Sequence, residues 1–383
     1  MRVKLGDIFE IGSGGTPSKL HPEYYDGNIP WVKTGDLKAE YLYEVEDYIT
    51  EEGLINSSAK LYEIDTVLVA MYGATIGATS ILKMPACTNQ ACAAFRKNER
   101  VVPEYLYYFL KSQKSRFVKD GVGGAQPNIS ARYLKRVQME LLSIDEQKAI
   151  VNILDKVTNV INKREEEIQF WDNLVKARFV EMFNETNANW KEVTIADICK
   201  DMRTGPFGSA LHHDEFVDEG IFVLGIDNAV ENKFSYNRMR YITEEKYEKL
   251  KRYTVHPGDV IITIMGTVGR SAVIPADMPK AINTKHLACL TPDTNIVDSY
   301  FLVNVFQIHP LIRHQLESQS KGAIMNGLNL TIIKGLKFRL PPLELQKEFV
   351  DFYKQIDKSK VKVQKALDET QKLFDSLMQQ YFG

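Results

Sequence analysis

The stretch DEQKAIVNILDKVTNVINKREEEIQFWDNLVKARFVEMF, residues 145–183, decides the fold of this 383-residue chain. It contains neither proline nor glycine, and its mostly apolar positions recur in alternating steps of four and three residues. That period is typical of a helix that packs along a partner helix. The sequence therefore predicts one continuous α-helix, about 55–60 Å long at 1.5 Å per residue. A helix of this length cannot bury its apolar stripe against one domain of ordinary size.

The chain carries the same pattern twice. VKLGDI at residues 3–8 returns as VTIADI at residues 193–198, and the apolar run that begins at Asp65 returns with Asp65 matched to Asp259. The long proline-free and glycine-free stretch returns at residues 344–382. Two copies indicate a tandem duplication rather than a solenoid, which needs three or more repeats.

Both long stretches share one heptad seam. Its residues are Ile150, Leu154, Val157, Ile161, Ile168, Trp171 and Val175 in the first copy, and Phe349, Tyr353, Ile356, Val363, Leu367, Phe374 and Leu377 in the second. Each stretch follows its own globular copy, so the first helix must carry the chain to the second copy and the second helix must run back. We therefore expect an antiparallel two-helix coiled coil with pseudo-two-fold symmetry. The alternative is an ordinary core helix packed within one domain.

The residues before each long stretch favour a mixed fold. Short β-branched runs bounded by glycine, proline or asparagine are typical of strands, and a few helical segments separate them. We predict an α+β chain in which two similar mixed α/β domains are separated by the coiled coil. The expected parts are a first domain at residues 1–143, a spacer helix at 144–186, a second domain at 187–342 and a second spacer helix at 343–383.

The composition is that of a soluble globular protein, with 44% hydrophobic and 26% charged residues. The sequence has no apolar run long enough to span a membrane and no signal peptide, so we expect a cytoplasmic protein. No CxxC pair occurs, so reduced buried thiols are expected rather than disulfides or a metal site. The four cysteines are Cys87, Cys92, Cys199 and Cys289.

The charges are segregated along the chain although the net charge is only −2. Acidic side chains dominate residues 35–65, and basic side chains dominate residues 96–136. This distribution allows a basic face that binds nucleic acid, although two solvated faces of opposite sign would explain it equally well. A spacer that separates two related domains suits a long, repetitive ligand, and duplex DNA is the first candidate. Two dissimilar domains would then read two dissimilar half-sites with a gap between them.

Several short pieces, in their order along the chain, are similar to one known family. They are GSGGTPSK (12–19), NIPWVKTGDL (28–37), MYGATIG (71–77), GAQPNIS (124–130) and IDEQKAIVNIL (144–154), followed by the long helix. Together with the duplication, they resemble the specificity subunit of a type I restriction–modification system over essentially the whole chain. The resemblance implies that the two domains are target-recognition domains, each reading one half of a bipartite DNA sequence. It further implies that the helices dock two modification (methyltransferase) subunits, that ATP-dependent restriction subunits join this core, and that the recognition chain is not catalytic.

The glycine-rich segment at residues 9–19 also raises the possibility of a phosphate or methyl-donor loop. Such a loop needs a strand-to-helix turn and an acidic residue about twenty positions later. The residues after Pro17 do not continue as a helix, and in the second copy, RTGPFGSAL (203–211), the glycines have moved. The sequence also lacks a Walker A motif, an Asn/Asp-Pro-Pro-aromatic motif and HExxH spacing. We therefore expect no cofactor, no metal and no catalytic residues.

Glycine- and serine-rich loops let backbone N–H groups approach phosphates and base edges, so DNA contacts are expected beside them. Amides such as those of Gln126 and Asn128 suit bidentate contact with adenine. The candidate DNA contacts are Lys19, Lys33, Thr34, Tyr72, Thr75, Gln126 and Asn128 in the first copy, and Arg203, Ser209, His212, Thr267, Arg270 and Lys321 in the second. Each of them is also explained as a solvated turn residue, and only some are expected to touch DNA.

Two other functions remain as alternatives to DNA reading. A two-headed protein–protein scaffold would use the same duplicated architecture without binding DNA. A stand-alone DNA-modifying enzyme is disfavoured by the missing motifs. The salt dependence of binding to random duplex separates the first alternative from a DNA reader, because phosphate contacts release counterions.

Overall fold

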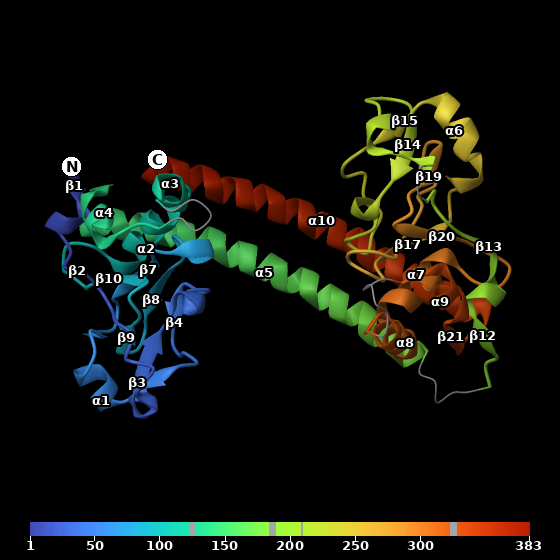
Figure 1. Cartoon of the computed structure of the whole chain (residues 1–383). Helices are drawn as coiled ribbons and strands as arrows, with labels where there is room; N and C mark the ends of the chain where they lie inside the picture. The colour runs from blue at the N-terminus through green and yellow to red at the C-terminus, as the bar shows by residue number, and fades with distance from the viewer. Residues whose placement is uncertain (123–127, 184–188, 208–209, 322–327) are drawn as a thin grey trace. The chain divides into compact units, whose positions relative to one another are not determined.

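The chain divides into two compact units. The structure is a computed structural model and describes residues 1–122, 128–183, 189–207, 210–321 and 328–383. The first unit contains residues 1–165 and 365–383, and the second contains residues 166–364. Each unit therefore combines a globular part with a portion of each long helix, and most of the elements are labelled in Figure 1.

The globular part of the first unit is built on two sheets. The strand order is β2-β10-β7-β8-β4 in the larger sheet and β5-β3-β9-β6 in the smaller, and β1 pairs with β11. The strands are β1 (Arg2–Lys4), β2 (Ile11–Ser13), β3 (Tyr25–Val32), β4 (Tyr41–Leu42), β5 (Tyr48–Ile49), β6 (Leu61–Tyr62), β7 (Val67–Ala70), β8 (Thr79–Leu82), β9 (Ala86–Thr88), β10 (Cys92–Phe95) and β11 (Gln138–Glu140). The helices are α1 (Glu51–Ile55), α2 (Pro103–Ser112), α3 (Lys114–Asp120) and α4 (Ala131–Arg136). The apolar run of β7 is buried throughout, because this strand lies in the middle of its sheet.

The globular part of the second unit repeats this plan. The strand orders are β13-β20-β17-β18 and β15-β14-β19-β16, and β12 pairs with β21. The strands are β12 (Glu192–Thr194), β13 (Cys199–Thr204), β14 (Ile221–Leu224), β15 (Tyr241–Ile242), β16 (Thr254–Val255), β17 (Val260–Thr263), β18 (Ser271–Val273), β19 (Ala281–Asn283), β20 (Leu287–Pro292) and β21 (Lys337–Arg339). The helices are α6 (Glu244–Leu250), α7 (Ser299–Ile308), α8 (Pro310–Lys321) and α9 (Leu330–Gly335). The two units share a parallel pair at equivalent places, β3 with β9 and β14 with β19, and the first unit has a further one, β4 with β8. The predicted duplicated mixed α/β fold is therefore confirmed.

One match between the two copies is wrong by one residue. The Asp65 N–H donates to the Leu82 carbonyl at 2.8 Å, and the Gly258 N–H donates to the Ile274 carbonyl at 2.9 Å. Both residues have positive φ, 67° at Asp65 and 85° at Gly258. Asp65 therefore corresponds to Gly258 rather than to Asp259. The left-handed turn before the strand fixes the register, and glycine and aspartate both tolerate it.

The two predicted long helices are confirmed as α5 (Ile144–Met182) and α10 (Leu343–Phe382). Within the second unit they pair antiparallel, because Arg178 of α5 binds Glu348 near the start of α10 at 3.1 Å, while the earlier Asp172 contacts the later Lys360. Within the first unit, residues from the start of α5 share a core with residues from the end of α10. None of the described helices is long and apolar enough to cross a membrane.

The helices bury more than the predicted seam. All the seam residues are buried or half-buried, as a seam requires. Residues off the seam, such as Phe179 and Met378, are buried as well, because the globular parts pack against the helices. The ring of Tyr108 in α2 lies 6.3 Å from that of Phe374, and the ring of Phe301 in α7 lies 5.9 Å from that of Phe179. Each portion of the helix pair therefore shares its core with the globular part of its own unit.

Candidate nucleic-acid interface

Loops that are distant in sequence meet along one edge of the first unit. We call residues 14–17, 33–36, 72–76, 89–91 and 128 the first rim. Its loops are joined by backbone hydrogen bonds of 2.8–2.9 Å, namely Gly15 N–H to the Thr88 carbonyl, Asn89 N–H to the Val32 carbonyl, Met71 N–H to the Ala91 carbonyl and Ile129 N–H to the Met71 carbonyl. The rim is thus a continuous surface of turns on a rigid two-sheet support, which is the usual location of binding residues.

The second unit builds the same edge from its own residues. We call residues 205–207, 225–228, 265–270, 284–286 and 328 the second rim. The equivalent backbone hydrogen bonds are Thr284 N–H to the Leu224 carbonyl at 3.0 Å, Ile264 N–H to the His286 carbonyl at 2.9 Å and Leu328 N–H to the Ile264 carbonyl at 3.0 Å. The duplication therefore repeats the backbone of the rim while the side chains differ.

A glycine at the start of each rim has a steric role. A Cβ on Gly14 would lie 1.7 Å from the carbonyl oxygen of Thr88, at the end of β9. A Cβ on Gly205 would lie 2.2 Å from the carbonyl oxygen of Asn283, at the end of β19. The expectation that all the glycines had moved between the copies is thus wrong for this pair. Glycine is needed here because the loop crosses a strand end at close range, and no phosphate has to be invoked.

The first rim brings together several of the predicted DNA contacts. Tyr72 is 43% exposed and forms an isolated backbone bridge with Asn128. The hydroxyl of Thr75 donates to the Tyr72 carbonyl at 3.2 Å. Lys33 is already engaged, since its ammonium lies 2.5 Å from Asp47. Among these candidates, Tyr72 and Asn128 are the exposed side chains.

Apart from Thr34, the remaining candidates of the first copy and three of the second lie off the rims or outside the described residues. Thr34 is half-buried on the first rim, and Lys19 is exposed on the loop that follows residues 14–17. Gln126 and Ser209 lie outside the described residues, and Lys321 is described only as the end of α8. His212 is exposed outside the rim, and its N–H donates to Glu215 at 2.7 Å.

Arg203 occupies the interior of the second unit instead of its surface. Arg203 is 15% exposed and its guanidinium lies 2.8 Å from the carboxylate of Asp259, which is 2% exposed. The same guanidinium donates to the Thr254 carbonyl at 2.5 Å and to the Thr291 hydroxyl at 3.1 Å. The His256 N–H also donates to Asp259, at 2.9 Å. We infer that Arg203 holds β13, β16, β17 and β20 together, because its donors are used within the protein.

Other rim side chains carry exposed polar or aromatic groups that the sequence did not single out. Gln90 and Lys285 are exposed at equivalent turns, after β9 and after β19. His286 is half-buried beside Lys285, and burial, followed by the charge of Lys285, lowers the pKa of His286. Phe207 is 58% exposed on the loop after Gly205. Only the strand register brings these turns next to the glycine loops, so a scan for local motifs could not find them.

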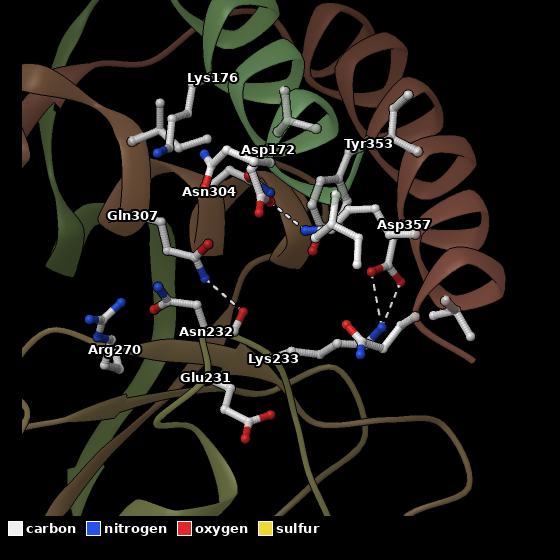
Figure 2. Close-up of a pocket in the computed structure, with 18 of the residues that line it drawn as sticks. Asp172, Lys176, Glu231, Asn232, Lys233, Arg270, Asn304, Gln307, Tyr353 and Asp357 are labelled. Carbon is white, nitrogen blue, oxygen red and sulfur yellow. Dashed lines mark hydrogen bonds and ion pairs between the residues drawn. The ribbon is translucent and has the colours of Figure 1, made fainter. Parts of the chain in front are cut away.

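A charged groove adjoins the second rim within the second unit. Its volume is about 730 Å³, and its walls are the β17–β18 turn, residues 231–233, α7, α8 and the helix pair. Figure 2 shows Lys233 reaching Asp357, with both carboxylate oxygens at 3.0 Å, and Gln307 donating to the Asn232 carbonyl at 3.0 Å.

Two cations of the groove carry no ion pair within the described part of the chain. Thr267 and Arg270 are exposed where the groove meets the second rim, and Lys176 lines the helix side. Lys176 and Arg270 make no ion pair with any described residue. Arg270 therefore supplies unpaired positive charge next to the rim and Lys176 supplies it on the helix side, while Glu231, which has no ion pair with a described residue either, also lines the groove. The cation beside the rim suits an anionic ligand such as a phosphodiester backbone.

The duplicated rims and the paired long helices define the class of protein. The family model described as "Type I restriction modification DNA specificity domain" matches residues 1–169 and again residues 187–370. The chain belongs to this family.

Several named proteins are similar to the chain. It is 32% identical over 185 residues to the MjaIX specificity subunit of Methanocaldococcus jannaschii, covering 47% of this chain and 43% of the relative. It is 31% identical over 164 residues to the EcoR124I/EcoR124II specificity subunit of Escherichia coli, covering 41% of each. The chain thus matches less than half the length of these two relatives. The MjaVIII specificity subunit of M. jannaschii is 20% identical over 391 residues, covering 95% of this chain and 89% of the relative.

Solved structures share the fold over the whole chain. The type I restriction–modification S subunit from M. genitalium superimposes with a TM-score of 0.59 at 16% identity, covering 100% of this chain and 96% of that one. A chain from a structure of complex assembly and conformational transition in the type I R-M system gives a TM-score of 0.61 at 17% identity, covering 100% and 97%. At these identities the similarity concerns the fold alone.

Proposed function

We propose that this chain is the DNA sequence-specificity subunit of a type I restriction–modification complex, and that each unit reads one half of an asymmetric bipartite target. The observation that carries the proposal is the repetition of one rim backbone with different side chains. Each rim consists of a few loops held on a rigid support, as a reader of base edges requires. A single unit would read one short half-site, and the second unit would add an independent one.

The two rims offer different chemistry at equivalent places. Thr16 and Gln90 in the first rim have Phe207 and Lys285 as their counterparts in the second. Amides, cations and apolar rings favour different base edges in the major groove, because each base pair presents its own pattern of donors, acceptors and methyl groups. The two half-sites are therefore expected to differ in sequence.

The long helices offer surfaces for protein partners. Ile153, Val160 and Leu373 are exposed on the helix pair in the first unit, and Phe170, Val180 and Val361 are exposed in the second. Exposed apolar side chains along a helix are typical of a surface that another helix covers. In this proposal the helices dock two modification (methyltransferase) subunits, and restriction subunits join the same complex. The chain itself selects the DNA and transfers no group.

Binding to DNA is tested with the full chain, alone and with its modification subunits. Affinity for random duplex, measured between low and moderate salt, should fall steeply, since each phosphate contact releases a counterion. Selection from a random duplex library should then enrich a split motif of two short half-sites. A protein–protein scaffold would bind random duplex weakly, with no salt slope and no enriched motif. That outcome would refute the proposal.

A further inference from the structure

The first rim contains a side-chain pair that no sequence motif predicts. The hydroxyl of Thr16 donates to the Oε1 atom of Gln90 at 2.5 Å, although the two residues are far apart in the chain. Thr16 stands there because Gly14 lets its loop cross the end of β9 at close range. Gln90 stands there because the turn after β9 starts at that same strand end. The two-sheet support thus fixes both partners, and Gln90 remains exposed.

This hydrogen bond determines which end of the amide is free. The Thr16 hydroxyl donates to the Oε1 atom of Gln90, and no described residue hydrogen-bonds the Nε2 atom of Gln90. An unrestrained glutamine reads adenine by accepting at Oε1 and donating from Nε2 at the same time. With its oxygen turned toward the Thr16 hydroxyl, the amide presents its Nε2 atom, with two N–H donors, as its free end. Guanine is the base that presents two adjacent acceptors, N7 and O6, in the major groove.

We propose that Thr16 and Gln90 form one reading unit, in which the Thr16 hydroxyl orients the Gln90 amide to donate to guanine in the first half-site. Thr16 is a positioning residue in this arrangement, and Gln90 is the residue that touches the base. The inference rests on the proposed function, because it presumes that the first rim faces DNA. In this arrangement Gln90 contacts one base of the half-site, and Thr16 determines which base Gln90 prefers.

The described residues of the second rim include no such pair. Phe207 replaces Thr16 at the equivalent place, and Lys285 replaces Gln90. A phenylalanine has no hydroxyl with which to orient a neighbour, so the second half-site is read there by different chemistry. Variants of the Thr16–Gln90 pair should therefore leave the second half-site unchanged.

The test uses the full chain with its modification subunits and selection from random duplex, followed by sequencing of the enriched motif. The Thr16→Val variant keeps the size of the side chain and removes the donor, which frees the amide. At one position of the first half-site, the preference should change from guanine toward adenine, by roughly tenfold or more for one bidentate contact. Gln90→Glu carries only acceptors and should favour cytosine at that position, because the N4 group of cytosine is a donor.

A matched control and the contrary outcomes complete the test. Thr158→Val makes the same chemical change on α5, where the Thr158 hydroxyl lies 3.4 Å from that of Tyr108, and should leave both half-sites unchanged. If the unaltered chain enriches a split motif and Thr16→Val leaves every position of the first half-site as it was, the reading unit is refuted. If the unaltered chain enriches no motif, the proposed function itself fails. Thermal unfolding of each variant identifies any loss that comes from folding.

Discussion

Replacing Arg203 with methionine should destabilise the second unit severely. The change removes one partner of a buried ion pair and leaves the Asp259 carboxylate, 2% exposed, without its cation. Breaking a buried pair in this way costs about 3–5 kcal/mol, because the remaining charge stays desolvated. The free energy of unfolding should therefore fall by about that amount, measured by urea denaturation at neutral pH with a probe in the second unit.

Two further variants isolate the cause. Arg252 is exposed over the ring of Tyr253, at 4.7 Å from its centroid, so Arg252→Met should cost less than about 1 kcal/mol. The double variant Arg203→Met with Asp259→Asn should recover part of the loss, because no uncompensated charge then remains buried. The reasoning is wrong if Arg203→Met costs less than about 1 kcal/mol, or if it weakens DNA binding while the free energy of unfolding is unchanged.

Three other changes have defined outcomes. His309 is 3% exposed, and burial lowers its pKa to about 4, so the folded state binds fewer protons than the unfolded state below pH 6.5. The free energy of unfolding should therefore fall by up to about 3 kcal/mol as the pH falls from 6.5 to 4. In pH-dependent denaturation, His309→Phe should flatten this fall, and the same change at exposed His314 should not. Gly14→Ala should lower the melting temperature of the first unit, because the added Cβ would collide with the Thr88 carbonyl at the end of β9. Gly35→Ala should shift the melting temperature little, because nothing lies within 4 Å of its Cβ. Equal shifts would refute the steric argument. Phe207→Ala should alter only the second half-site of the selected motif and leave stability within about 0.5 kcal/mol, since the ring is mostly exposed; a change in the first half-site would count against independent rims.

The helices and the duplication could be predicted from the sequence because their signals are local and periodic. The proline-free stretch from Asp145 to Phe183 predicts a helix, and α5 runs from Ile144 to Met182. A heptad period depends only on which residues share one face of a helix, so it needs no knowledge of the rest of the fold. What the seam did not predict is the burial of Phe179, because that residue packs against α7 through tertiary contacts.

The candidate interface is harder to predict from the sequence, because strand register creates it. The match of Asp65 to Asp259 is off by one residue, because a left-handed backbone turn and not residue identity decides the register. Arg203 has a side chain typical of a DNA contact, but Asp259, directly before β17, pairs with it in the interior of the second unit. Gln90 is an ordinary turn residue in sequence and becomes prominent only when Thr16 lies beside it. Local patterns thus predict helices and strands well, whereas contacts between side chains of distant turns depend on the strand register of the sheet.

The central claim, that each unit reads its own half of a split target, is tested most directly by exchange of one domain. Residues 187–342 are replaced by the corresponding residues of another family member, the chimera is produced in cells with the modification subunits, and methylated adenines are sequenced across the genome. One half of the methylated motif should change to that of the donor while the other half stays the same. A motif in which both halves change, or neither, would contradict the claim.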